Sequence, residues 1–262
     1  MIPERCIKEW SEFLPWKSKE YIEQDLIICR ALCALYNDEY LAEHLAFRGG
    51  TALNKIYINP QSRYSEDIDL VQVNAEPIKD TINRIREVLS FLGKPAVKQK
   101  AHNNTLVFRF NSEIPPITPI RLKIEINTRE HFNVLGLAKH DFQVNSQWFL
   151  GSCKVTTYYL EELLGTKMRA LYQRRKGRDL FDLWKALSTQ NTDNEKIIHC
   201  YKEYIGFVVD NPPTQKEYLL NMELKLKDDE FLGDIEMLLR PDEKYNPVEA
   251  WELVRSLLIE KL

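Results

Sequence analysis

Two short motifs lie close together in the sequence and could do chemistry on phosphate groups. They are FRGGT at residues 47–51 and RYSEDIDL at residues 63–70. Side chains alternate along an extended strand, so Asp67 and Asp69 should share one face. Neighbouring carboxylates repel unless a cation, a basic partner or protonation relieves them. Of these, a bound Mg²⁺ ion would also serve catalysis on phosphates, because Mg²⁺ prefers carboxylate and phosphate oxygens as ligands.

The glycine pair in the first motif suits a turn that holds phosphates. Gly49 and Gly50 let backbone N–H groups approach a phosphate, and a helix beginning near Thr51 directs its positive end at the same point. Thr51 can cap that helix or donate its hydroxyl. We assign Arg63 and Ser65 to the same phosphate site. Two simpler interpretations stay open: a plain strand-to-helix turn, and an acidic surface strand tied to Arg63.

A third acid, Glu125, lies in the run IRLKIEI at residues 120–126. Its strict alternation predicts a strand with one face in the core. Glu125 falls on the polar face, together with Arg121 and Lys123, and could be a solvated residue there. Alternatively, this strand lies beside Asp67 and Asp69, and Glu125 supplies a third metal ligand or a base for an incoming hydroxyl.

A lysine occupies the apolar stripe of a helix predicted later in the chain. Helical spacing aligns Lys167 with four leucines: Leu160, Leu163, Leu164 and Leu171. An ammonium group on such a stripe either snorkels to the edge or neutralises an anion. We favour the second, since a triphosphate held between the two halves of the chain would need such a point charge.

Two aspartates follow on the next predicted helix. Asp179 and Asp182 lie three residues apart, on a face beside the core stripe. They could form salt bridges with the neighbouring basic residues Arg174, Arg175 and Arg178. One of them could instead orient Lys167 or a substrate hydroxyl, and spacing alone leaves both interpretations open.

The hydrophobic pattern indicates the elements that position these residues. It predicts helices at about 20–37 and 76–92, and strands at 96–99, 105–110 and 120–127, with a hairpin turn at 102–104. From about residue 156 the pattern is almost wholly helical. We therefore predict a first domain at 1–150 and a helical domain at 151–262.

Composition limits the classes of protein to consider. The 262 residues are 44% apolar and 29% charged, which suits a globular chain with a sizeable core. No apolar run approaches the roughly 20 residues that a membrane span needs, so we expect a cytoplasmic protein with no membrane partner. The five cysteines are scattered and odd in number, which favours reduced thiols.

The net charge of −3 gives no global attraction for nucleic acid. Any such partner would have to bind a local basic patch. One candidate patch consists of Lys167, Arg169, Arg174, Arg175, Lys176 and Arg178.

Five motifs between residues 47 and 184 together resemble the AbiEii-type nucleotidyltransferase toxins. They read GGTAL, RYSEDIDL, KIEIN, TKMRAL and RDLFDL. The resemblance implies an α+β fold: a nucleotidyltransferase-type mixed sheet flanked by helices, followed by a helical half that closes a cleft for an NTP and Mg²⁺. Matched motif by motif, it implies phosphate contacts for Gly49, Gly50 and Thr51, metal ligation by Asp67, Asp69 and Glu125, and catalytic roles for Lys167 and Asp182. Asp179 is a possible substitute for Asp182.

Similar toxins transfer nucleotides, in studied relatives to the acceptor end of tRNA, and are opposed by an antitoxin encoded beside them. The leading hypothesis is therefore a magnesium-dependent toxin of the abortive-infection type that transfers NMP from an NTP to an RNA acceptor, with tRNA the first candidate. Two alternatives remain: nucleotidylation of a protein or small-molecule hydroxyl, and an NTP-binding regulator without turnover.

Overall fold

The computed structural model describes residues 2–262, and these divide into two compact units. Val134–Gly136 and Tyr159–Leu262 form the second unit, and the remaining described residues form the first. The sequence-based boundary near residue 150 falls at the start of a strand that belongs to the first unit and ends at Tyr158.

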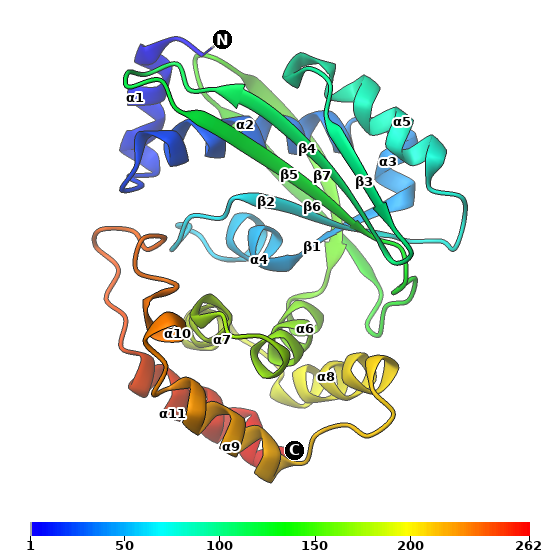
Figure 1. The fold of residues 1–262 in the computed structure, drawn as a ribbon, viewed down its shortest axis with the longest axis vertical. Helices are drawn as coiled ribbons and strands as arrows, with labels where there is room; N and C mark the ends of the chain where they lie inside the picture. The colour runs from blue at the N-terminus through cyan, green and yellow to red at the C-terminus, as the bar shows by residue number, and fades with distance from the viewer. Residues whose placement is uncertain (1) are drawn as a thin grey trace. The chain divides into compact units, whose positions relative to one another are not determined.

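A seven-stranded mixed sheet forms the centre of the first unit, in the order β3-β4-β5-β2-β1-β7-β6 (Figure 1). The pairs β2–β5 and β1–β7 are parallel, and the other neighbours are antiparallel. The strands are β1 Leu45–Arg48, β2 Asp67–Gln72, β3 Ala96–Lys100, β4 Asn103–Asn111, β5 Pro119–Asn127, β6 Leu137–Asn145 and β7 Leu150–Tyr158.

Helices pack on this sheet and connect its strands. The long helix α2 contacts β5, β6 and β7, and it buries Leu26, Ile28 and Leu32 completely. The other short and long helices of this unit are α1 Glu4–Phe13, α3 Glu39–His44, α4 Gly49–Ala52, η1 Leu53–Tyr57, α5 Lys79–Val88 and η2 Ser90–Leu92, with α2 itself at Lys19–Tyr36.

Helix α2 also fixes how two central strands meet. The buried Gln24 donates from Nε2 to the backbone oxygens of Glu66, at 2.9 Å, and Arg121, at 3.1 Å. Glu66 immediately precedes β2, and Arg121 lies near the start of β5. One amide group therefore ties together the ends of the two strands that carry the acidic residues.

The second unit is helical apart from short connections. Its helices are α6 Leu160–Gln173, α7 Gly177–Thr189, α8 Asn194–Val208, α9 Gln215–Lys225, α10 Asp229–Gly233, α11 Pro247–Leu257 and η3 Ile259–Lys261. Helices α6 and α8 approach closely at Gly165, where an added Cβ would lie 2.6 Å from Cys200 Cβ. A capping box of Thr214 and Glu217 starts α9.

The predicted α+β class is confirmed, and so are the predicted helix at 20–37 and the three predicted strands. The predicted hairpin turn at 102–104 is displaced: the turn lies at residues 101–102, and Asn103 and Asn104 already belong to β4. The sequence also missed β6 and β7. The inward face of β6 carries His140 and is only half-buried except at Val144, and the last four residues of β7 are all buried, so neither strand gives a strong pattern of alternating apolar residues.

Candidate active site

The three predicted acids lie on neighbouring strands. Asp67 and Asp69 occupy alternate positions at the start of β2 and therefore share one face. The parallel register sets Lys123 beside Asp67 and Glu125 beside Asp69. The strand that carries Glu125 thus lies next to the Asp-x-Asp strand, as the metal-ligand hypothesis requires.

Lys123 neutralises part of this acidic group. Its Nζ lies 2.8 Å from Asp67 Oδ2 and 3.3 Å from Glu125 Oε2. Burial raises the pKa of Asp67 to about 6 in spite of Lys123, and the nearby charge of Asp69 acts in the same direction as burial. Burial alone would lower the pKa of Lys123, but Asp67 and Glu125 raise it above its ordinary value. Asp67 and Glu125 thus share the ammonium group of Lys123 across the two strands.

The glycine turn packs directly against one of the acids. Gly49 has φ +78°, a conformation that L side chains rarely adopt, and a Cβ added there would lie 2.3 Å from Asp69 Oδ2. Two independent constraints therefore require glycine at this position. The turn brings the backbone at Gly49 close to the side chain of Asp69.

Thr51 and Arg63 are buried and bonded within the protein, which favours a bracing role over the expected phosphate contact. The Thr51 hydroxyl hydrogen bonds with Ser65 Oγ at 2.6 Å and also donates to the backbone oxygen of Asp67. Arg63 is 2% exposed and donates to the backbone oxygen of Tyr64 at 2.9 Å. Nor is Thr51 the helix cap, since α4 begins at Gly49 with Arg48 in the cap position. These side chains hold the loop that leads into β2.

Lys167, in the second unit, is buried between the two candidate aspartates. Its Nζ lies 2.9 Å from Asp179 Oδ1 and 2.7 Å from Asp182 Oδ2. Arg174 also contacts Asp179, at 2.6 Å. Burial would raise the pKa of Asp179, but Lys167 and Arg174 together lower it below its ordinary value. The lysine is thus neutralised within its own unit, and Asp179 both pairs with an arginine and orients Lys167.

The candidate basic patch is less cationic than its sequence suggests. Five of its six members form ion pairs with acids: Lys167 with Asp179 and Asp182, Arg174 with Asp179, Arg175 with Asp228, and both Lys176 and Arg178 with Asp234. The sixth, Arg169, lies over the ring of Tyr204. A nucleic acid binding here would have to compete with these acids.

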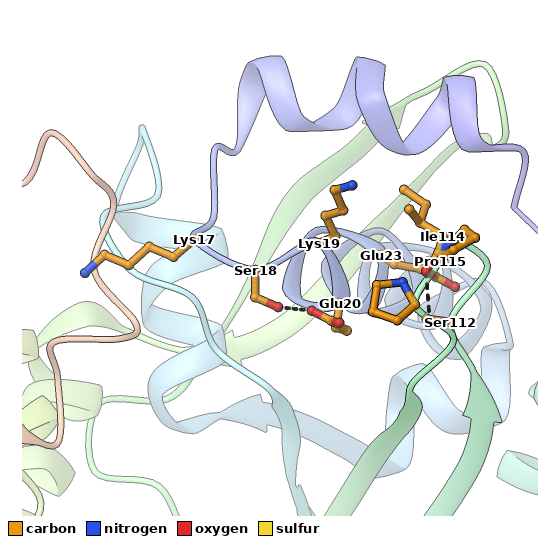
Figure 2. Close-up of a pocket in the computed structure, with 9 residues that line it drawn as sticks. Lys17, Ser18, Lys19, Glu20, Glu23, Ser112, Ile114 and Pro115 are labelled. Carbon is orange, nitrogen blue, oxygen red and sulfur yellow. Dashed lines mark hydrogen bonds between the residues drawn. The ribbon is translucent and has the colours of Figure 1, made fainter.

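A hollow of about 320 Å³ on the first unit lies beside the start of α2 and the 112–116 segment (Figure 2). Its acids already have partners: Glu20 accepts from Thr118 Oγ1 at 3.2 Å, and Glu23 accepts the N–H of Glu113 at 3.0 Å. The side chain of Lys17 points away from the other labelled residues in Figure 2. The residues that line the hollow include none from the two motifs, so the acidic group on β2 and β5 is the better candidate site.

Comparison with known proteins decides the family. The profile described as "Nucleotidyl transferase AbiEii toxin, Type IV TA system" matches residues 30–254. The chain belongs to the AbiEii nucleotidyltransferase toxin family.

Solved structures agree at the level of the fold. MenT4, a nucleotidyltransferase toxin from Mycobacterium tuberculosis, is 15% identical with a TM-score of 0.66, covering 100% of this chain and 91% of its own. JHP933 from Helicobacter pylori is 16% identical with a TM-score of 0.55, covering 93% of each chain. A search of curated protein sequences found no match.

Membership in the AbiEii family makes this chain a nucleotidyltransferase with an NTP as substrate, and it implies an antitoxin partner. The family also usually requires a divalent metal. Within residues 2–262, no group of three or more His, Cys, Asp or Glu side chains is arranged to hold one. Mg²⁺, however, usually takes only one or two carboxylates and completes its shell with water and substrate phosphates. The carboxylate oxygens of Asp67 and Asp69, which share one face of β2, fit that requirement. No helix among the described residues has the length and apolar character to cross a membrane.

Sequence reasoning on this AbiEii chain missed two contacts at the site. It placed Lys123 on the same side as Glu125, but only the parallel register shows that it reaches Asp67. It also missed the pair of Arg48 and Glu130, whose Nη1 and Oε2 lie 2.5 Å apart just before the glycine turn. A lysine two residues from an acid on a strand was the available signal for the first, and the second had none.

Proposed function

We propose that this AbiEii protein is a magnesium-dependent toxin that transfers NMP from an NTP to an RNA acceptor, with tRNA as the acceptor, in a toxin–antitoxin system of the abortive-infection type. The observation that carries this proposal is the acidic group itself. Asp67, Asp69 and Glu125 lie on adjacent strands, and the Gly49 turn packs against Asp69. A cytoplasmic location, where NTPs and tRNA meet, belongs to the same proposal.

Each residue has a part in the proposed reaction. Asp67 and Asp69 would hold the metal, which when bound would supply charge stabilisation for the phosphates. Glu125 completes the acidic set as a further ligand or as the base that takes the proton of the incoming hydroxyl. The backbone of Gly49 and Gly50 faces the phosphates.

Lys167 and Asp182 belong to the proposal through their family motifs. A 2.7 Å contact between Lys167 Nζ and Asp182 Oδ2 holds the two side chains together. The adjacent carboxylate offsets part of the cost of burying the ammonium group. We assign the pair to stabilising charge as pyrophosphate leaves, with Asp182 orienting the lysine.

The test follows the label of an α-³²P NTP. Purified protein is incubated in Mg²⁺ with each NTP in turn, together with total RNA and total protein from cells. We expect label in the tRNA fraction, and none with a folded Asp69→Asn variant. Label in the protein fraction would favour nucleotidylation of a protein. Tight NTP binding with no pyrophosphate release would favour a regulator without turnover.

A further inference from the structure

One ammonium group bridges carboxylates of both acidic strands. The contacts of Lys123 with Asp67 and Glu125, at 2.8 Å and 3.3 Å, run across the β2–β5 ladder. The register makes this bridge possible, because it sets Lys123 and Glu125 directly beside Asp67 and Asp69. Lys123 thus places a positive charge where the metal is proposed to bind.

An ammonium and Mg²⁺ compete for the same carboxylate oxygens. Mg²⁺ lies about 2.0–2.1 Å from its oxygen ligands, and its charge repels a neighbouring ammonium. The side chains of Lys123, Asp67 and Glu125 are 25%, 23% and 33% exposed. The flexible stem of the lysine can therefore turn away without opening the core.

We propose that Lys123 is a placeholder cation, which occupies the acidic site without metal and moves to the nucleotide phosphates when metal and NTP enter. The inference rests on the proposed function, because it assumes that Asp67 and Asp69 bind the metal. A displaced ammonium beside an incoming triphosphate has a strong electrostatic partner. Metal alone then binds weakly, and metal with a triphosphate binds well.

A simpler role for Lys123 would be a cross-strand ion pair that only supports the sheet. Partly exposed pairs of this kind contribute little to stability. Such a role gives no reason for metal affinity to rise when the lysine is removed. The two roles therefore predict different metal binding by the same variant.

The test measures Mn²⁺ binding by electron paramagnetic resonance of the free ion, without nucleotide. Variants are Lys123→Met, Lys123→Gln and a matched control, Lys139→Met, whose lysine is exposed on the edge strand β6. We expect both Lys123 variants to bind Mn²⁺ about tenfold more tightly than the wild type, because a competing charge is gone. The control should match the wild type.

A second titration uses inorganic tripolyphosphate in saturating Mn²⁺, which removes any dependence on the base. We expect the Lys123 variants to bind tripolyphosphate about tenfold more weakly, because the displaced ammonium is missing. Urea unfolding shows whether each variant is folded, and Lys123→Gln serves if Lys123→Met is not.

Unchanged or weaker Mn²⁺ binding by folded Lys123 variants would overturn the inference. Tighter Mn²⁺ binding with unchanged tripolyphosphate binding would overturn the movement of Lys123 to the phosphates.

An Asp69→Asn variant distinguishes a failure of this inference from a failure of the proposed metal site. If that variant binds Mn²⁺ as the wild type does in both titrations, the metal site of the proposed function fails. If it loses binding while Lys123→Met matches the wild type, only the placeholder fails.

Discussion

The backbone of Gly49 passes directly against the side chain of Asp69. An ideal Cβ on Gly49 would lie 2.3 Å from Asp69 Oδ2 and 3.0 Å from Asp69 Cβ. Arg48, which precedes Gly49 in the chain, is paired with Asp69 in the antiparallel β1–β2 ladder, and this pairing fixes the distance between the turn and the carboxylate. The turn and the carboxylate are therefore set by the same pair of strands.

This contact predicts that Gly49→Ala loses nucleotide transfer by about a hundredfold or more, because Asp69 must move. The positive φ adds about 1–2 kcal/mol of destabilisation. Gly93→Ala is the matched control: Gly93 has φ +82° with no atom within 4 Å of an added Cβ. Urea unfolding and NMP transfer are measured for both. Equal loss of activity in the two variants would show that backbone strain, and not Asp69, is responsible.

The buried hydroxyl of Thr51 gives a second prediction. Thr51→Val leaves the backbone oxygen of Asp67 without its donor and should lower the free energy of unfolding by about 1–3 kcal/mol. Thr51→Ser keeps the hydroxyl and should recover most of that loss. Urea unfolding is measured together with the affinity for Mg²⁺–NTP. A Thr51→Val protein of normal stability that binds NTP poorly would support the phosphate contact and contradict the bracing role.

The ion pairs around Asp179 give a third prediction. Asp179→Asn leaves Lys167 and Arg174 with less negative charge and should cost about 3–5 kcal/mol in unfolding free energy at pH 7. Asp242→Asn, in an exposed pair with Arg240, should cost almost nothing.

The same aspartate predicts a pH dependence. Its folded pKa is lowered, so its contribution to stability is fully present above the unfolded pKa near 4 and is lost as pH falls below it. Urea unfolding at pH 7, 5 and 3 should show the wild type losing its advantage over Asp179→Asn on acidification. A constant difference between the two proteins over this range would contradict the assigned cause.

The sequence predicted which residues share a face better than it predicted what they touch. Side chains alternate along a strand, so the sequence alone places Asp67 and Asp69 on one face, and Lys123 and Glu125 on one face. The parallel pairing of β2 with β5 joins segments far apart in the chain, and no local pattern specifies that register. The contact of Lys123 with Asp67 could therefore appear only in the structure.

The burial of polar side chains was a second property that the sequence could not predict. The phosphate contact of Thr51 and Arg63 stays a prediction. No local pattern shows that both side chains are buried and bonded within the protein, because this depends on the packing of α4, η1 and the loop before β2. The apolar stripe predicts an anionic partner for Lys167, and the triphosphate favoured for that role stays a prediction. In the structure its partners are both candidate aspartates, since residues three apart on α7 face the same point.

Lys225 gives the last prediction. It is 4% exposed, and its ammonium donates to the backbone oxygens of Leu171 and Tyr172 near the end of α6. Burial lowers the pKa of Lys225 to about 8. Between pH 8 and the unfolded value near 10.4, the unfolded chain binds more protons than the folded one, so this group makes stability rise with pH. Urea unfolding from pH 7.5 to 10 should show the wild type gaining about 1–3 kcal/mol relative to Lys225→Met. A parallel decline of the two proteins would show that Lys225 remains charged throughout, held by the two carbonyl groups.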